Sequence, residues 1–151
     1  MNLQKGQSMF ELVVAIAICA LIIVAIVSLT TVSINNSSYS KNKALASTYA
    51  QQATEWLRGQ RDTNIDTFIG NATAAPARCL QDLDFTRPAV NPAVDCTGKI
   101  IDTPFVRWVS FNPSLQGGKT VVEADITVSW ADSQGTHTVR SATNFSDWRE
   151  R

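Results

Sequence analysis

The chain has 151 residues, a mass of 16.5 kDa and a formal net charge of zero at pH 7, with 13 basic and 13 acidic residues. This length is enough for about one domain, and the balanced charge does not indicate a nucleic-acid-binding surface. Hydrophobic residues make up 44% of the chain, but many of them are concentrated near the N-terminus.

The longest apolar stretch lies between Leu12 and Val27, where no side chain is strongly polar. Leu29, Val32 and Ile34 continue its apolar character. A helix needs roughly 20 mostly apolar residues to cross a bilayer, so the stretch predicts a transmembrane helix. A secretory signal peptide would have a shorter apolar region followed by a small-residue cleavage site, and no such site follows here.

Two residues at the edge of this stretch distinguish it from a simple anchor. Glu11 lies within the apolar edge, where an ionised carboxylate is costly, and Gly6 ends the short leader MNLQKG. In one interpretation, Glu11 reaches the lipid headgroups and interacts with the positive end of the helix dipole. In the other, a protease cleaves at Gly6, where the backbone is accessible. Glu11 then neutralises the new α-amino group of a neighbouring subunit.

Residues 6–11, GQSMFE, followed by an unbroken apolar helix, resemble the prepilin signature of type IV filament proteins. The resemblance implies that a membrane peptidase cleaves between Gly6 and Gln7, and that Gln7 becomes an N-methylated first residue. It also implies that Glu11, the fifth residue of the mature chain, acts in assembly. Gln7 departs from the phenylalanine or methionine usual in the family, which bears on N-methylation and not on cleavage.

The helix is expected to continue beyond the apolar stretch. Residues 35–43 are polar but contain neither Pro nor Gly, and an amphipathic pattern begins at Ala44. Gly59 is a suitable C-cap. We therefore expect one helix from about Ser8 to Arg58, with residues 7–34 in the membrane or filament core and residues 35–59 against the soluble domain. The predicted contact face contains Leu45, Tyr49, Ala53, Trp56 and Leu57.

Residues 60–104 contain four of the five prolines and show no periodicity, so we expect an irregular loop region. Residues 62–66, DTNID, have the alternating oxygen ligands of a calcium loop, but Thr67 and Thr73 replace its glycine and glutamate. A turn at the helix exit is the preferred interpretation, and we expect no metal and no cofactor.

The three cysteines fall into two groups. Cys19 lies in the membrane run and is interpreted as a small apolar residue. Cys79 and Cys96 lie in the exported part, where a disulfide can form; the alternative is two free thiols. A bond between them would close a loop of about 17 residues and contribute on the order of 3 kcal/mol through chain entropy.

Residues 105–148 are expected to form an antiparallel sheet. Apolar and polar residues alternate along Lys119–Trp130, and Gly117-Gly118 and residues 132–135 are turn signals. The predicted fold class is therefore α+β: a long N-terminal helix packed on a three- or four-stranded meander, as in a type IV pilin. Phe105–Phe111 and Thr136–Phe145 are the other predicted strands, and the large side chains available for the core are Trp108, Trp130 and Trp148.

The C-terminal sequence adds a second resemblance, to minor pilins and minor pseudopilins. It is carried by Ile126–Trp130, Asp132, Gly135, Val139, Phe145 and Trp148, together with the helix stretch Ala46–Arg58 that ends in EWLR. The single histidine, His137, is expected to face solvent on the last strand. Neither a nucleophile elbow nor a phosphate loop is present in the sequence, so we expect no enzymatic activity.

These resemblances imply a structural subunit, a minor pilin or pseudopilin, of a type IV pilus or related secretion filament. The precursor would lie in the cytoplasmic membrane with leader 1–6 in the cytoplasm, and the assembled subunit in a cell-surface or periplasm-spanning filament. Its partners would be other pilin or pseudopilin subunits, the prepilin peptidase and the membrane, without direct nucleic-acid binding. A major pilin and an uncleaved, single-pass membrane-anchored binding domain remain as alternatives.

Overall fold

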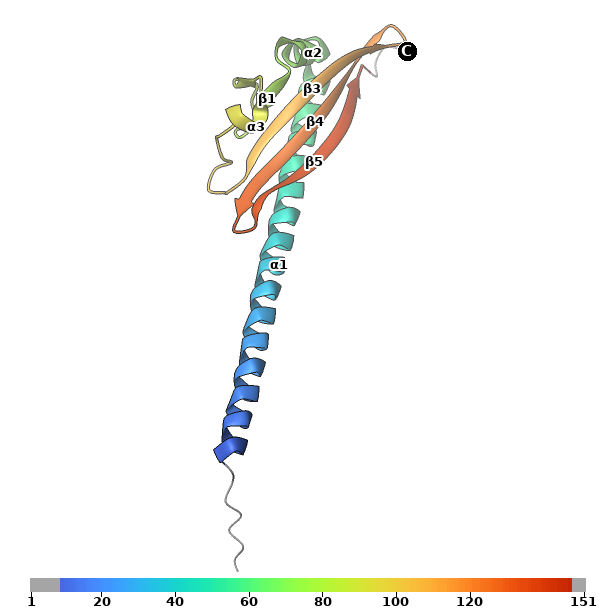
Figure 1. Ribbon diagram of the computed structural model, residues 1–151. Coiled ribbons are helices and arrows are strands. Elements are labelled where there is room, and N and C mark those ends of the chain that lie inside the picture. Colours follow the sequence, from blue (N-terminus) through green and yellow to red (C-terminus); the bar gives the residue numbers. More distant parts are fainter. Residues whose placement is uncertain (1–8, 148–151) are drawn as a thin grey trace, which may run out of the picture. The chain divides into compact units, whose positions relative to one another are not determined.

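The structure is a computed structural model that describes residues 9–147. The chain divides into two compact units, and the division lies between Lys41 and Asn42. Helix α1 (Met9–Thr63) provides all of the described first unit and the beginning of the second (Figure 1). The predicted α+β class is confirmed, because a long helix is followed by an antiparallel sheet.

In the first unit, the apolar sequence is helical from Met9 onward. The hydroxyl groups of Thr30 and Thr31 donate hydrogen bonds to the carbonyls of Ile26 and Val27, at 2.8 and 3.0 Å. The polar groups of both threonines are therefore satisfied within the helix, so they do not interrupt an otherwise apolar segment.

The helix ends five residues later than predicted, at Thr63, and Gly59 is not its cap. The residues after Gly59 are compatible with a helix, and the Thr63 hydroxyl bonds back to the Gly59 carbonyl at 2.8 Å. The chain leaves α1 at Asn64, whose side chain accepts the Thr67 N–H at 2.9 Å and so caps α2 (Ile65–Ala74). The DTNID segment is thus a junction between two helices.

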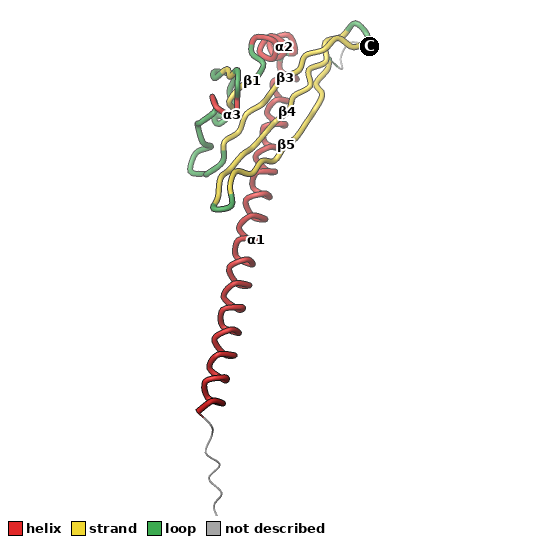
Figure 2. Tube along the Cα trace, in the orientation of Figure 1, coloured by secondary structure: helices red, strands yellow, loops and turns green. Residues whose placement is uncertain are grey.

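The second unit contains a five-stranded antiparallel sheet in the order β2-β1-β3-β4-β5. The predicted meander is present as β3 (Val106–Gln116), β4 (Lys119–Asp132) and β5 (Gly135–Ser146), which lie side by side in Figure 2. Two short strands, β1 (Ala77–Cys79) and β2 (Pro88–Ala89), extend it to five strands.

Residues 60–104 are therefore more regular than predicted, because they contain α2, β1, β2 and the short helix α3 (Pro92–Asp95). Strands of two and three residues are too short to produce a recognisable alternation. Their positions depend on tertiary contacts, which composition does not reveal.

One face of the sheet packs against helices and forms the main core. The buried residues of α1 are mostly small; they are Ala46, Ala50, Ala53, Thr54 and Leu57. The predicted helix face was therefore partly wrong: Leu45 is exposed, while Tyr49 and Trp56 are half-buried. From α2, the Phe68 ring lies 5.3 Å from that of Phe145.

A smaller core lies on the opposite face of the sheet. Cys79 pairs with Trp108 and Arg78 with Val109, so Cys79 and Trp108 lie on the face away from Val109. The cluster contains Ala77, Cys79, Ala89 and Cys96, with Val106 and Trp108 packed against it. Trp108 therefore belongs to this second core and not to the helix-facing core, which contains Trp130. Trp148 lies outside the described residues.

Candidate functional site

The predicted cleavage site, Gly6 and Gln7, lies outside the residues that the structure describes. Glu11 lies in the first turn of α1, where its side chain is exposed. A carboxylate in the first turn is favoured by the positive end of the helix dipole. This position is compatible both with a headgroup contact and with an ion pair to another chain.

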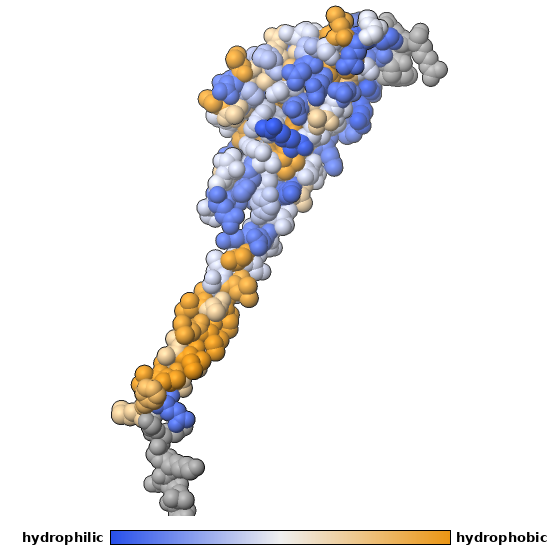
Figure 3. Space-filling model, turned by 45° about the vertical axis from the view of Figure 1, so that its right-hand side comes forward, coloured by the Kyte–Doolittle hydropathy of each residue, from blue (hydrophilic) through white to orange (hydrophobic). Residues whose placement is uncertain are grey.

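The α1 surface that follows is apolar on all sides. Every large hydrophobic side chain between Met9 and Ile34 is exposed, and the least exposed of them, Val14, still has 39% of its surface accessible. Figure 3 shows these hydrophobic side chains gathered over this part of the helix. A helix that is hydrophobic all round requires burial in protein or lipid.

By length and composition, this helix could cross a membrane. The 23 residues from Leu12 to Ile34 span about 34 Å as a helix, against a hydrocarbon thickness of about 30 Å. Between Met9 and Ile34 there are fifteen Leu, Ile, Val or Phe residues, which together favour insertion by roughly 4–9 kcal/mol. That sum exceeds the cost of about 3 kcal/mol for one carboxylate, even at the membrane centre.

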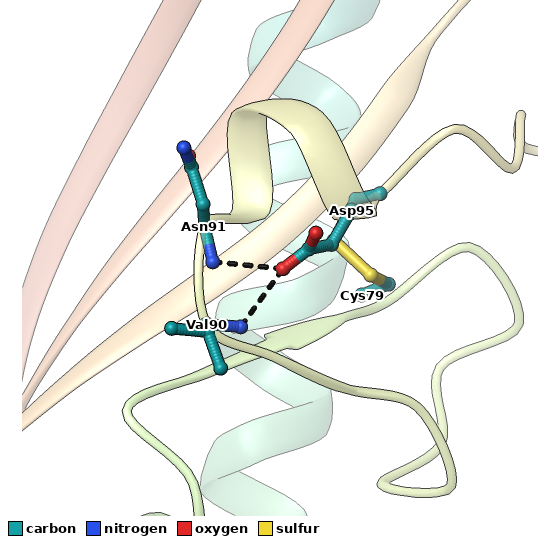
Figure 4. Close-up of a disulfide and its surroundings, with 5 residues drawn as sticks. Cys79, Val90, Asn91 and Asp95 are labelled. Carbon is teal, nitrogen blue, oxygen red and sulfur yellow. Dashed lines mark hydrogen bonds between the residues drawn. A yellow bond between two sulfur atoms is a disulfide. The ribbon is translucent and has the colours of Figure 1, made fainter.

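The predicted disulfide is confirmed: Cys79 and Cys96 are bonded, with their Cα atoms 5.3 Å apart. The enclosed loop is also held by Asp95, whose Oδ2 accepts the backbone N–H groups of Val90 and Asn91 at 2.9 and 2.8 Å (Figure 4). The disulfide therefore ties the end of α3 to β1, the strand next to the edge strand β2. Cys19 is a free cysteine in α1.

Two arginines are buried on the helix-facing side of the sheet. Arg107 is 2% exposed; its Nε and Nη2 donate to the Leu80 carbonyl at 3.0 and 2.9 Å, and its Nη1 donates to the Tyr49 carbonyl at 2.9 Å. Burial lowers the pKa of Arg107 to about 10, while Tyr49 acts in the opposite direction. Arg107 thus ties β3 to both α1 and the end of β1.

Arg78 in the same way connects β1 to α2 and to the chain that follows β1. Its Nε and Nη2 donate to the Asn71 carbonyl at 3.1 and 2.9 Å, and its Nη1 donates to the Phe85 carbonyl. Burial lowers its pKa. Both guanidinium groups bond to backbone carbonyls, which indicates a role in holding segments together.

The prediction that His137 faces solvent was wrong. It pairs with Trp130 across β4 and β5, its ring centroid lies 5.3 Å from that of Trp130, and its side chain is 23% exposed. Its Nε2 lies 3.0 Å from Asp132 Oδ1. The pKa of Asp132 is lowered, chiefly by the Gln134 N–H and then by His137. The histidine therefore belongs to the structure of the β4–β5 hairpin.

Neither buried arginine was predicted from the sequence, although the residue pattern around Arg107 indicates a buried position. In FVRWVSF, Arg107 has the same strand parity as Val109 and Phe111, so a period-two pattern places it on their buried face.

Within residues 9–147 the structure contains neither a cavity nor a group of three metal-ligating side chains. Comparisons of the chain with protein-family models, curated proteins and solved structures found no match.

Proposed function

We propose that this chain is a structural subunit, a minor pilin or pseudopilin, of a type IV pilus or related secretion filament. The observation that carries the proposal is the N-terminal part of α1. It combines an apolar surface exposed on all sides with a single carboxylate, Glu11, at its first turn. The GQSMFE motif precedes and overlaps this surface.

The proposed mechanism begins with cleavage after Gly6, which leaves a cationic α-amino group on Gln7 near the lipid edge. Leaving the membrane is unfavourable for one such helix, because its apolar surface would meet water. Helices of several subunits can cover that surface by packing on one another. The carboxylate of Glu11 in one subunit then pairs with the amine of the next, which removes much of the cost of two isolated charges in an apolar environment.

The first experiment tests processing. The full chain is co-expressed with a prepilin peptidase, and its mass is measured by intact-protein mass spectrometry. We expect the chain to become shorter by residues 1–6, and Gly6→Val to block this change. A chain that keeps its leader in both cases would contradict the proposal and favour the uncleaved membrane-anchored domain.

The second experiment tests assembly. Glu11→Ala should leave cleavage and membrane insertion unchanged but lower incorporation into sheared filaments by at least about tenfold, which corresponds to 1.4 kcal/mol. Glu55→Ala is the matched control, since Glu55 is an exposed carboxylate on the same helix, paired with Arg58 at 2.7 Å. Equal incorporation of both variants would contradict the charge-pairing role. The abundance of the wild-type chain in the filaments separates a minor from a major subunit.

A further inference from the structure

The two edges of the sheet differ. At one edge, β2 has only two residues, and one of them is Pro88, which has no N–H group to donate. At the other edge, β5 runs for twelve residues and pairs with β4 in one continuous register. Natural proteins protect sheet edges with prolines, bulges, charges or short strands. Between Thr136 and Phe145, β5 has only one such device, Arg140.

The register identifies which backbone groups of β5 point away from the sheet. Gly117 and Gly118 have φ values of +60° and +82° and form a two-residue turn, so the flanking residues Gln116 and Lys119 are a hydrogen-bonded pair. Bonded and non-bonded pairs alternate along antiparallel strands. Odd-numbered residues of β4 therefore bond to β3, and even-numbered residues bond to β5.

Since Val128 pairs with Val139, the odd-numbered residues of β5 bond to β4. The bonds from Leu80 N–H to the Arg107 carbonyl and from Phe111 N–H to the Pro76 carbonyl agree with this alternation. The outward-pointing N–H and C=O groups thus belong to the even-numbered residues, Thr136, Thr138, Arg140, Ala142 and Asn144. Within residues 9–147, no backbone bond joins these groups to another segment.

The side chains of β5 indicate what could cover this edge. On the helix-facing side, Val139, Ser141 and Thr143 are only half-buried, so the covered face of the sheet is incomplete at β5. On the other side, Arg140 is exposed, and the described residues provide no ion pair for it. An incoming strand with a carboxylate beside Arg140 would complement this charge.

We propose that β5 accepts, by strand addition, an extended segment of a different filament subunit that carries a carboxylate facing Arg140. The proposal rests on the proposed function, since assembly brings subunits side by side. A second copy of β5 fits this edge less well. In antiparallel registers that pair most of the strand, the two Arg140 side chains would be opposite or diagonal to each other, and like charges so placed are unfavourable.

The direct test is hydrogen exchange resolved to single amides, measured on the full chain in detergent micelles and in sheared filaments. In micelles, the outward amides of Thr138, Arg140 and Ala142 should exchange rapidly, whereas those of Val139 and Ser141 should be protected. In filaments, the outward amides should become at least about 100-fold slower. Rapid exchange of the outward amides in filaments would overturn the proposal.

Two pairs of variants test the edge independently. Ala142→Pro removes an outward N–H without removing a bond to β4, and edge strands tolerate proline at such positions. It should lower incorporation at least about tenfold, whereas Ala142→Val should not. If Ala142→Pro does not fold, Arg140→Glu should show the same loss, and Arg140→Lys should retain incorporation. Equal incorporation within each pair would contradict strand addition.

A photo-crosslinker at Thr138 identifies the occupant. Linkage to an extended segment of another filament subunit, with an acidic residue near Arg140, supports the proposal, and linkage to β5 of a second copy overturns it. These outcomes are distinguishable from failure of the proposed function, because cleavage after Gly6 and the Glu11 effect do not depend on β5.

Discussion

The buried guanidinium of Arg107 permits a quantitative test of what holds the second unit together. We consider Arg107→Met, which keeps a long apolar side chain but removes the charge and all five N–H donors. The carbonyl of Leu80 would lose two hydrogen bonds, and that of Tyr49 would lose one. Because Arg107 is 2% exposed, water would not easily reach these two carbonyls to replace the lost hydrogen bonds.

Two opposing effects determine the size of the change. A hydrogen bond from a charged donor contributes about 1.5–3 kcal/mol to stability, and Arg107 makes three. Against this, burial lowers the pKa of Arg107 to about 10, well below its ordinary value, and each pKa unit corresponds to about 1.4 kcal/mol against the charged form. The hydrogen bonds exceed the desolvation, so Arg107→Met should lower the free energy of unfolding by about 3 kcal/mol.

The assay is denaturant unfolding of the full chain in detergent micelles, followed by tryptophan fluorescence. All four tryptophans lie after residue 55, so the signal reports on the second unit. Arg140→Met is the matched control: it removes an exposed arginine and should change stability by less than about 0.5 kcal/mol. If Arg107→Met destabilises the chain no more than Arg140→Met, then Arg107 does not hold the unit together.

Three further predictions concern the same unit. Replacing both Cys79 and Cys96 by serine should lower the free energy of unfolding by about 3 kcal/mol, and a chain equally stable with and without reductant would contradict this. Ala50→Leu should cost about 1–3 kcal/mol because Ala50 is 1% exposed, whereas Ala44→Leu, at an exposed position, should cost little in the same unfolding assay. The lowered pKa of Asp132 means that its charge stabilises the fold above the unfolded-state pKa, near 4. Asp132→Asn should therefore be less stable than wild type at pH 7, and the difference in denaturation midpoint should disappear as pH falls through the folded-state pKa.

Periodic segments of the chain were predicted well from sequence. The alternation in Lys119–Trp130 and the Gly117-Gly118 turn gave β4 and the β3–β4 hairpin, because a strand with one buried face must alternate. The long helix followed from its apolar run and the absence of proline. Gly59 was a misleading signal, since a helix tolerates glycine at a cost of about 1 kcal/mol.

The parts that could not be predicted depend on contacts between distant residues. β1 and β2 are too short to show a pattern, and they are held by the Cys79–Cys96 bond and by Arg78, which reaches Asn71 and Phe85. The disulfide could be predicted because only two cysteines lie outside the apolar run. The position of His137 beside Trp130 depends on the register between β4 and β5, which the sequence pattern alone does not determine.

The two units differ in how much of their apolar surface is covered, and this difference bears on function. In the second unit, helices cover one face of the sheet and a disulfide-linked cluster packs on part of the other. In the first unit, the described apolar side chains are all exposed. A membrane would cover them equally well without Glu11: the helix dipole favours a carboxylate in the first turn, but moving that charge into the membrane weakens insertion. A simple anchor therefore gains nothing essential from Glu11, whereas a helix that must pair with the amino terminus of its neighbour requires a negative charge near that end.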